Sequence, residues 1–314
     1  MATPTTDQMT PTTPASSPAP KTKKELRAEK KKRKKMGRRI KTLSPMNFIM
    51  PFIMKDRCDA LNYFTGEVEI DRAEKYIAQK RKEGYTNFGL MHLFLASYVR
   101  TVAEKPGLNR YVRGQLIYAR NNIEIALTIK KEMKADSPDT VVKFRPTPDA
   151  TAVEIYEQVN ATIEASKADT VTGFDTLMKV LTYLPRVIFR FVVWLLFVLD
   201  YWNLIPKWLT DLSPFHASYF ITSMGSLGIP PIYHHIYNFG TVPVFTSFGA
   251  KRRAYELQKD GTVKEKKMVD FKVVMDERIC DGFYYAAAFK RMMFYLRHPE
   301  KLDVPPAKVE EDIR

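Results

Sequence analysis

The residues with the clearest capacity for chemistry lie in the stretch VVMDERICDGFYYAAAF, residues 273–289. An apolar run typical of a buried strand leads into Asp276, Glu277, Arg278 and Asp281, and a helical pattern follows. The stretch contains no histidine, the side chain that most often transfers protons near neutral pH. A glutamate titrates near ~4.3 unless burial raises its pKa and makes it competent in proton transfer. The alternative is a structural ion pair between Glu277 and Arg278 or another cation.

Helices and strands alternate irregularly around this stretch. Alternating or apolar runs predict strands at residues 66–70, 219–223, 242–248 and 268–275. Helical periodicity with capping and stop signals predicts helices at residues 71–84, 87–107, 149–169 and 282–297. Residues 116–119 and 123–129, joined by the polar Asn121–Asn122, predict a β-hairpin. We therefore expect a mixed α/β (α+β) fold with antiparallel pairing.

Four segments in order resemble the chloramphenicol acetyltransferase-like fold, which includes the catalytic domains of dihydrolipoamide acyltransferases. DERICDG and the following helix resemble the C-terminal signature His/Asp–His–x–x–x–Asp–Gly. KPGLNRYVRGQLIYARNNIEIALTI, YFITSMGSLGI and VPVFTSFGAKRR resemble earlier family segments. The resemblance covers about residues 47–302. It implies a mixed sheet flanked by helices, a homotrimer with active sites between subunits, and acyl-CoA as the thioester substrate.

The resemblance also implies roles for single residues. The second residue of the signature is the family's catalytic histidine, and Glu277 occupies that position here. The family base removes a proton from a hydroxyl or thiol, which then attacks the thioester carbonyl. Asp281 would hold the turn through an ion pair with a basic residue, and Arg278 would also be structural. Gly282 would let the backbone turn tightly into the helix.

Hydroxyl and imidazole groups elsewhere in the chain are further candidates. The family places a serine or threonine hydroxyl near the oxyanion, and the candidates here are Thr222, Ser223 and Ser226. The alternative is that these hydroxyls only form hydrogen bonds with backbone groups at the end of a strand. Three histidines flank that strand and are possible alternative bases, although single histidines are more often structural: His216, His234 and His235. No cysteine or carboxylate spacing supports a metal site at the histidine pair, so we expect no metal. Cys280 ends an apolar strand, which predicts an inert buried thiol.

Positive charge is concentrated at the N-terminus. Residues 1–45 hold thirteen Lys/Arg and three Asp/Glu, so they carry +10 of the total net charge of +15. Residues 1–43 are Pro/Thr-rich and then basic, which predicts a disordered tail whose basic part, 21–41, is either a solvated linker or a tether to an anionic membrane surface or an acidic partner. The rest of the chain carries only +5, which argues against a nucleic-acid-binding domain. The two cysteines make no disulfide framework and favour a cytoplasmic location, with or without peripheral membrane attachment.

An apolar insertion interrupts the resemblance at residues 177–212. All three tryptophans lie in it, at Trp194, Trp202 and Trp208. Its longest uninterrupted apolar run is residues 191–199, shorter than the ~20 residues a membrane-spanning helix needs. The insertion is either a helix buried against the body or another subunit, or an interfacial, lipid-binding helix. We divide the chain into the tail 1–43, an acyltransferase-like domain 44–304 and a flexible end 305–314.

These observations together predict an acyltransferase that moves an acyl group from a CoA thioester to a hydroxyl or thiol acceptor. The apolar insertion favours a hydrophobic or lipid-like acyl chain or acceptor. The alternative is a non-catalytic trimeric scaffold or thioester-binding pseudoenzyme that has lost the catalytic histidine. A third possibility is a membrane-surface adaptor based on the tail and the insertion.

Overall fold

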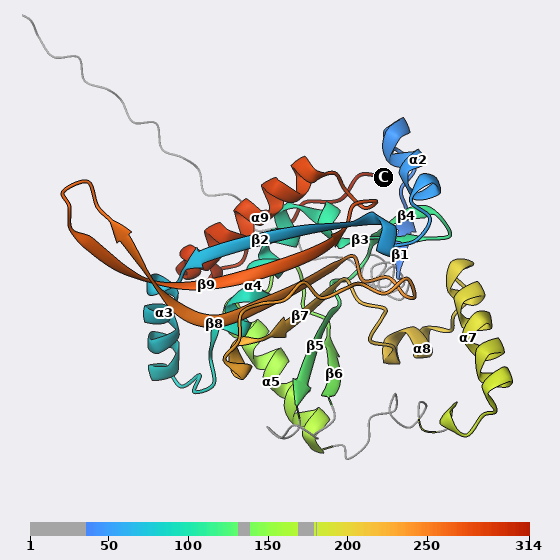
Figure 1. Ribbon diagram of the computed structural model, residues 1–314, viewed down its shortest axis with the longest axis horizontal. Helices are drawn as coiled ribbons and strands as arrows, with labels where there is room; N and C mark the ends of the chain where they lie inside the picture. Colours follow the sequence, from blue (N-terminus) through green and yellow to red (C-terminus); the bar gives the residue numbers. More distant parts are fainter. Residues whose placement is uncertain (1–35, 131–138, 169–178, 180) are drawn as a thin grey trace, which may run out of the picture. The chain divides into compact units, whose positions relative to one another are not determined.

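The computed structural model describes residues 36–314 except for 131–138, 169–178 and 180 (Figure 1). The helices are α2 (Pro45–Ile53), α3 (Asp71–Lys82), α4 (Leu90–Glu104), α5 (Ala152–Ala168), α7 (Arg186–Tyr201), α8 (Lys207–Leu212) and α9 (Gly282–Arg297). The strands are β1 (Gly37–Arg39), β2 (Leu61–Glu69), β3 (Arg110–Arg113), β4 (Leu116–Arg120), β5 (Ile125–Lys130), β6 (Asp139–Phe144), β7 (Tyr219–Ser223), β8 (Val244–Leu257) and β9 (Val263–Asp276).

A six-stranded mixed sheet forms the centre of the fold, in the order β2-β9-β8-β7-β5-β6. The pairs β5–β7 and β7–β8 are parallel, and the other pairs are antiparallel. The parallel pairs bring the ends of β5 and β7 to the same edge of the sheet. The predicted mixed α/β fold is confirmed, because helices and strands of one chain share a common core.

One face of the sheet is covered by α4 and α9, which pack on each other and run along the strands (Figure 1). From α4, Phe94 stacks on Phe248 of β8 at a centroid distance of 4.6 Å, and Tyr98 stacks on Tyr219 of β7 at 3.7 Å. From α9, Phe289 stacks on Phe64 of β2 at 5.5 Å. Residues 92–103 of α4 are all buried, so this helix is the centre of the main core.

The opposite face of the sheet is covered less completely. Its smaller apolar cluster combines sheet residues with the loop that follows β7, and its members are Ala126, Ala217, Ile236, Val242, Phe245 and Val274. No helix of the described chain forms part of this cluster. The open face is therefore where a cavity can form.

The predicted hairpin at residues 116–129 is wrong. β4 pairs with β1 and β3 in a separate three-stranded sheet, whereas β5 joins the central sheet. The turn that does form is Gly114–Gln115, between β3 and β4, and both residues have positive φ, as a tight two-residue hairpin turn requires. Asn121–Asn122 instead links the two sheets. The apolar alternation on both sides of this polar pair showed that two strands were present, but wrongly suggested that they pair with each other.

β8 and β9 are longer than predicted. Beyond the register shift between Phe248 and Lys251 they continue as a paired arm that projects from the sheet (Figure 1). Charged residues dominate residues 251–267, so the segment lacks the apolar alternation by which strands are recognised. Residues 305–314, expected to be flexible, contact the body, because Asp312 pairs with the buried Arg110 at 2.5 Å.

The insertion forms α7 and α8 and is fastened to the body at one end of α7. Asp200 accepts hydrogen bonds from Arg113 Nη2 at 2.6 Å and from the Gly240 amide at 2.9 Å. Burial alone would raise the pKa of Asp200, but the hydrogen bond to His216 and the charge of Arg113 lower it to about 2. None of the described helices is both long and apolar enough to span a membrane.

We predict that Phe94→Ala lowers the free energy of unfolding by about 3–5 kcal/mol, because it leaves a cavity where α4 meets β8 and β9. The measurement is chemical denaturation. The control is Phe283→Ala at the start of α9, where the side chain is 87% exposed and the expected change is within about 0.5 kcal/mol. Equal losses in both variants would contradict the assigned core.

Candidate active site

The signature turn at the end of β9 is held by Asp276. Its carboxylate is almost completely buried and pairs with two buried arginines, Arg57 at 3.2 Å and Arg278 at 2.8 Å. Arg57 also donates to the carbonyls of Tyr237 and Gly240, each at 2.7 Å. Burial lowers the pKa of Arg57, and the neighbouring Asp276 charge opposes that effect. The cluster therefore joins β9, the segment before β2 and the loop after β7.

Glu277 follows immediately and is half-buried. Its amide donates to the Ala60 carbonyl at 2.8 Å, which fixes the backbone. Across the described residues, no hydrogen bond or ion pair engages its carboxylate, and Arg278 pairs with Asp276 instead. The ion pair between Glu277 and Arg278 considered as an alternative is not formed. The carboxylate at the signature position is thus unpaired within the described part of the chain.

Asp281 caps α9 rather than forming the ion pair that the resemblance implies. Its Oδ1 accepts from the Tyr284 amide at 2.8 Å, which satisfies a free N–H in the first turn. The buried ion pair at the turn is made by Asp276 with Arg57 and Arg278. Gly282 is the first residue of α9, and a β-carbon there would meet no atom within 4 Å, so a tight backbone turn does not explain it. Burial of Cys280 raises the pKa of its thiol, in agreement with an inert residue.

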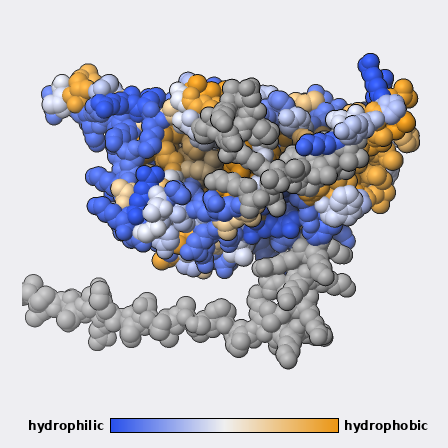
Figure 2. Space-filling view, turned by 90° about the horizontal axis from the view of Figure 1, so that it is seen from below, coloured by the Kyte–Doolittle hydropathy of each residue, from blue (hydrophilic) through white to orange (hydrophobic). Residues whose placement is uncertain are grey.

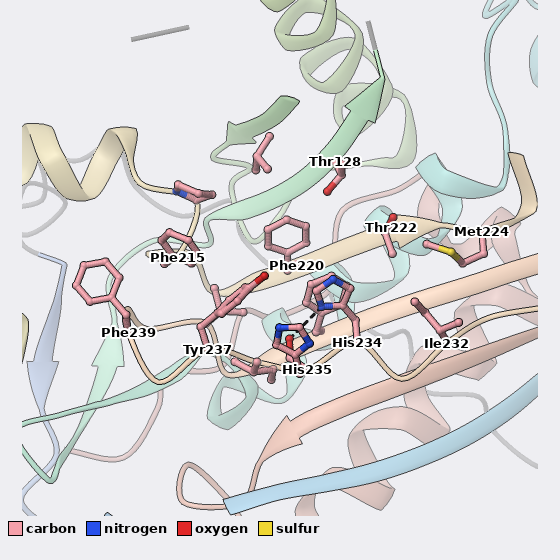
Figure 3. Close-up of a pocket in the computed structure, with 15 residues that line it drawn as sticks. Thr128, Phe215, Phe220, Thr222, Met224, Ile232, His234, His235, Tyr237 and Phe239 are labelled. Atoms are coloured by element: carbon pink, nitrogen blue, oxygen red, sulfur yellow. Dashed lines mark hydrogen bonds between the residues drawn. The ribbon is translucent and has the colours of Figure 1, made fainter. Parts of the chain in front are cut away.

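An apolar cavity of about 430 Å³ opens on the less covered face of the sheet (Figure 3). Its walls include Phe215, Phe220, Phe245 and Tyr237. Such a cavity, mainly aromatic and aliphatic with a few polar groups, is the usual form of a small-molecule site. Glu277 is not among its lining residues.

The polar side chains of the cavity include Thr222, Thr128, His234 and His235, besides the hydroxyl of Tyr237. His234 stacks on Phe245 at a centroid distance of 4.1 Å, and its Nδ1 lies 3.0 Å from the His235 carbonyl oxygen. Figure 3 shows the two imidazoles side by side below Phe220. Burial lowers the pKa of His234, so its imidazole stays neutral, and able to accept a proton, at a lower pH than an exposed histidine.

The other candidate residues lie outside this cavity. Ser223 ends β7, and Ser226, in the short 3₁₀ turn Gly225–Leu227, donates from Oγ to the Ser223 carbonyl at 3.1 Å. His216 is buried, with Nδ1 2.8 Å from Ser213 Oγ and Nε2 3.2 Å from Asp200 Oδ1. Both nitrogens of His216 are therefore engaged in fastening the insertion. Of the candidate hydroxyls, Thr222 is the one that lines the cavity.

Metal-binding geometry is not found in the described part of the chain, where no three His, Cys, Asp or Glu side chains gather closely enough to hold an ion. The two adjacent histidines stack on one another at 5.0 Å and have no carboxylate beside them in the cavity wall.

The chain was compared with known protein families, curated sequences and solved structures. No protein-family model and no curated protein sequence matches the chain. A probable dihydrolipoamide acetyltransferase from Listeria monocytogenes matches in structure with a TM-score of 0.53 and 15% identity, over 86% of this chain and 99% of that one. The Azotobacter vinelandii dihydrolipoamide acetyltransferase matches at 0.54 and 12% identity, over 83% and 93%. A truncated catalytic core of the Thermoplasma acidophilum 2-oxoacid dehydrogenase complex matches at 0.51 and 12%, over 83% and 98%.

The chain has the fold of dihydrolipoamide acetyltransferase catalytic domains. The predicted resemblance is confirmed at the level of fold, and the fold is one that acyltransferases use. Sequence reasoning did not anticipate the pairing of Asp276 with Arg57 or the cavity beneath the loop after β7. Arg57 offered no signal, because it lies 219 residues from Asp276 in a segment without a motif.

We predict that Asp276→Asn lowers the free energy of unfolding by about 3–5 kcal/mol, because it leaves Arg57 and Arg278 buried without a counter-charge. The matched control is Asp270→Asn, which breaks a partly exposed pair with Arg252 and should cost at most about 1 kcal/mol. Denaturant unfolding measures both. A small effect of Asp276→Asn would show that the turn does not depend on this carboxylate.

Proposed function

We propose that the protein transfers an acyl group from an acyl thioester, with acyl-CoA as donor, to a hydroxyl or thiol acceptor. The observation that carries the proposal is the Glu277 carboxylate. It follows β9 at the position of the family's base and remains unpaired while Asp276 engages both neighbouring arginines. The shared fold of dihydrolipoamide acetyltransferases supports the reaction class.

In the proposed reaction Glu277 accepts the proton of the acceptor's O–H or S–H group. The oxygen or sulfur then attacks the thioester carbonyl, and a hydroxyl group stabilises the tetrahedral oxyanion. Collapse of the intermediate breaks the carbon–sulfur bond, and the proton held by Glu277 passes to the departing CoA thiolate. Thr222 is the candidate hydroxyl facing the cavity, and Ser223 and Ser226 lie at the end of the same strand.

The apolar cavity supports a hydrophobic acyl chain or a hydrophobic acceptor. A homotrimer with sites between subunits, as the resemblance implies, would let the cavity of one subunit meet Glu277 of a neighbour. His234 and His235 are the alternative bases within the cavity itself, and the neutral imidazole of His234 supports that role. His216 is a weaker candidate, because Asp200 and Ser213 occupy both of its nitrogens.

We also propose that the protein is cytoplasmic and attaches peripherally to an anionic membrane surface. The support is the basic segment 21–41 together with the tryptophan-rich insertion, since stable attachment usually takes two signals.

The second candidate function is a non-catalytic trimeric scaffold or thioester-binding module. The substitution that favours it is the glutamate itself, because a carboxylate is a poorer base than imidazole near neutral pH. Under this function the cavity would bind an acyl thioester without turning it over.

The test is thiol release from a panel of short- and long-chain acyl-CoAs with a mixture of alcohol and thiol acceptors. We expect the wild type to turn over and Glu277→Gln to lose at least about 10²-fold in rate, because general-base catalysis contributes at that scale. His234→Gln is the matched comparison and should retain most of the rate.

The other outcomes of this assay indicate a different base or a different function. Loss of turnover in His234→Gln but not in Glu277→Gln would identify His234 as the base. Because burial lowers the pKa of His234, activity would then persist below the usual histidine pKa of ~6.5. Donor binding without turnover would support the thioester-binding module. Neither binding nor turnover with any donor would refute the acyltransferase proposal.

We predict that Phe220→Ala shifts the preferred donor towards longer acyl chains, because removal of this ring enlarges the cavity beside Phe245. The measurement is kcat/KM across the chain-length panel. Leu257→Ala, on the exposed arm, is the control and should leave the preference unchanged. An unaltered chain-length preference in Phe220→Ala would show that the acyl chain does not bind in this cavity.

A further inference from the structure

α7 is apolar except for Arg186, Arg190 and Asp200, and yet most of its large apolar side chains lie on the surface. Its first six residues, 186–191, are all exposed, and among its residues only Asp200 is buried. The exposed large side chains of the helix include Val187, 80% exposed, and Trp194, 57% exposed. A large exposed apolar surface normally marks a contact with another protein or with lipid. The described chain does not cover this one.

α2 shows the same property. It carries no charged residue and leaves large apolar side chains in solvent. Those exposed residues are Met46, Phe48, Ile49, Phe52 and Ile53. The rings of Phe48 and Phe52 lie 5.7 Å apart, on one side of the helix. Sequence analysis did not single out this helix, because nine residues are too few to draw attention as a membrane segment.

Both helices rest on the hairpin of β3 and β4. α2 packs on β4, and Tyr201 at the end of α7 donates from its hydroxyl to Gln115 Oε1 at 2.8 Å. Gly114 in the same turn approaches the Tyr201 carbonyl so closely that a β-carbon would lie 2.8 Å from it. Figure 1 shows α2 and α7 at the same end of the molecule, and Figure 2 shows hydrophobic surface gathered at that end. We call this end, formed by residues 45–53 and 186–208, the α2–α7 face.

The exposed charges of α7 are all positive. Arg186 and Arg190 are exposed, whereas Asp200, the only acidic residue of α7, is buried against Arg113. The exposed Lys55 and Asp56 follow α2 and offset each other, whereas the basic segment 21–41 ends four residues before α2 begins. A surface that combines exposed Trp and Phe with cations matches the headgroup region of an anionic bilayer.

We propose that the α2–α7 face docks on the surface of an anionic lipid bilayer, with α2 and α7 both lying in the interface. A helix of 16 residues spans only about 24 Å, less than the ~30 Å hydrocarbon core, so α7 lies on the membrane rather than across it. A second copy of this chain is a poorer occupant, because it would bring the same arginines rather than opposing carboxylates. The inference rests on the proposed membrane attachment and is independent of acyl transfer.

Intrinsic fluorescence reports on this face alone, because all three tryptophans belong to it: Trp194, Trp202 and Trp208. The full-length protein is titrated with vesicles of phosphatidylcholine and with vesicles containing about one-third phosphatidylserine. We expect binding and a shift of emission to shorter wavelength with the anionic vesicles, and quenching by lipids that carry a spin label near the headgroup. Binding without any change in tryptophan emission would overturn the proposal, because attachment would then run through the basic tail alone.

Substitutions separate the two helices from the tail. Ile49→Gln/Ile53→Gln on α2 keeps every tryptophan, and Phe191→Gln/Trp194→Gln tests α7; each pair should weaken binding at least about tenfold, since each buried large apolar side chain contributes more than ~1.4 kcal/mol. Leu257→Gln/Val263→Gln removes equally exposed apolar groups from the arm and should not change binding.

The outcomes are distinguishable. No binding of the wild type to anionic vesicles would refute membrane attachment itself. Binding of wild type and all variants with equal affinity would leave attachment to the tail and refute the docking face. If sedimentation without vesicles shows a wild-type oligomer that the α2 or α7 variants dissociate, the face is an interface between copies and the proposal fails. Acyl-CoA turnover measured without lipid is unaffected by any of these results.

Discussion

The constraint on which the rest of the site depends is the burial of Asp276 between two arginines. A buried carboxylate without partners would be very costly, and two buried guanidinium groups would be as well, so the three residues are stable only together. Because Arg57 also donates to the Tyr237 and Gly240 carbonyls, the cluster fixes the loop over the cavity as well as the signature turn. Because Arg278 pairs with Asp276, the Glu277 carboxylate has no cation beside it among the described residues.

A second buried carboxylate performs the same task for the insertion. Asp200 connects α7 to β3 through Arg113 and to the loop after β7 through the Gly240 amide. Gly240 thus receives contacts from both clusters, since its carbonyl accepts from Arg57. The loop that roofs the cavity and the helix that carries the exposed apolar surface are both held through the backbone of Gly240, so the two features cannot be positioned independently.

The sequence predicted what depends on local pattern and missed what depends on distant pairing. Strand β7, the ends of β8 and β9 and helix α9 carry their own periodicity and capping, so their placement followed from the residues. The partner of β4 could not be predicted, because alternation shows that a strand exists and not which strand lies beside it. The same holds at the site: Glu277 was found from a motif, but the sequence did not show that Arg278 would pair with Asp276 rather than with Glu277. Thr222 and His234 were named as candidates, yet only the fold brings them to one cavity.

The arm of β8 and β9 has a consequence for solubility. Beyond Lys267 the two strands pair only with each other, so both outer edges present unpaired backbone groups to any extended chain. Exposed edges of this kind invite strand addition between molecules. The arm is densely charged, with lysine and arginine at positions 251–253, 264, 266 and 267, and cross-strand pairs such as Lys266–Glu256. Like charges on two approaching arms repel, so the ribbon can protrude into solvent without seeding aggregation.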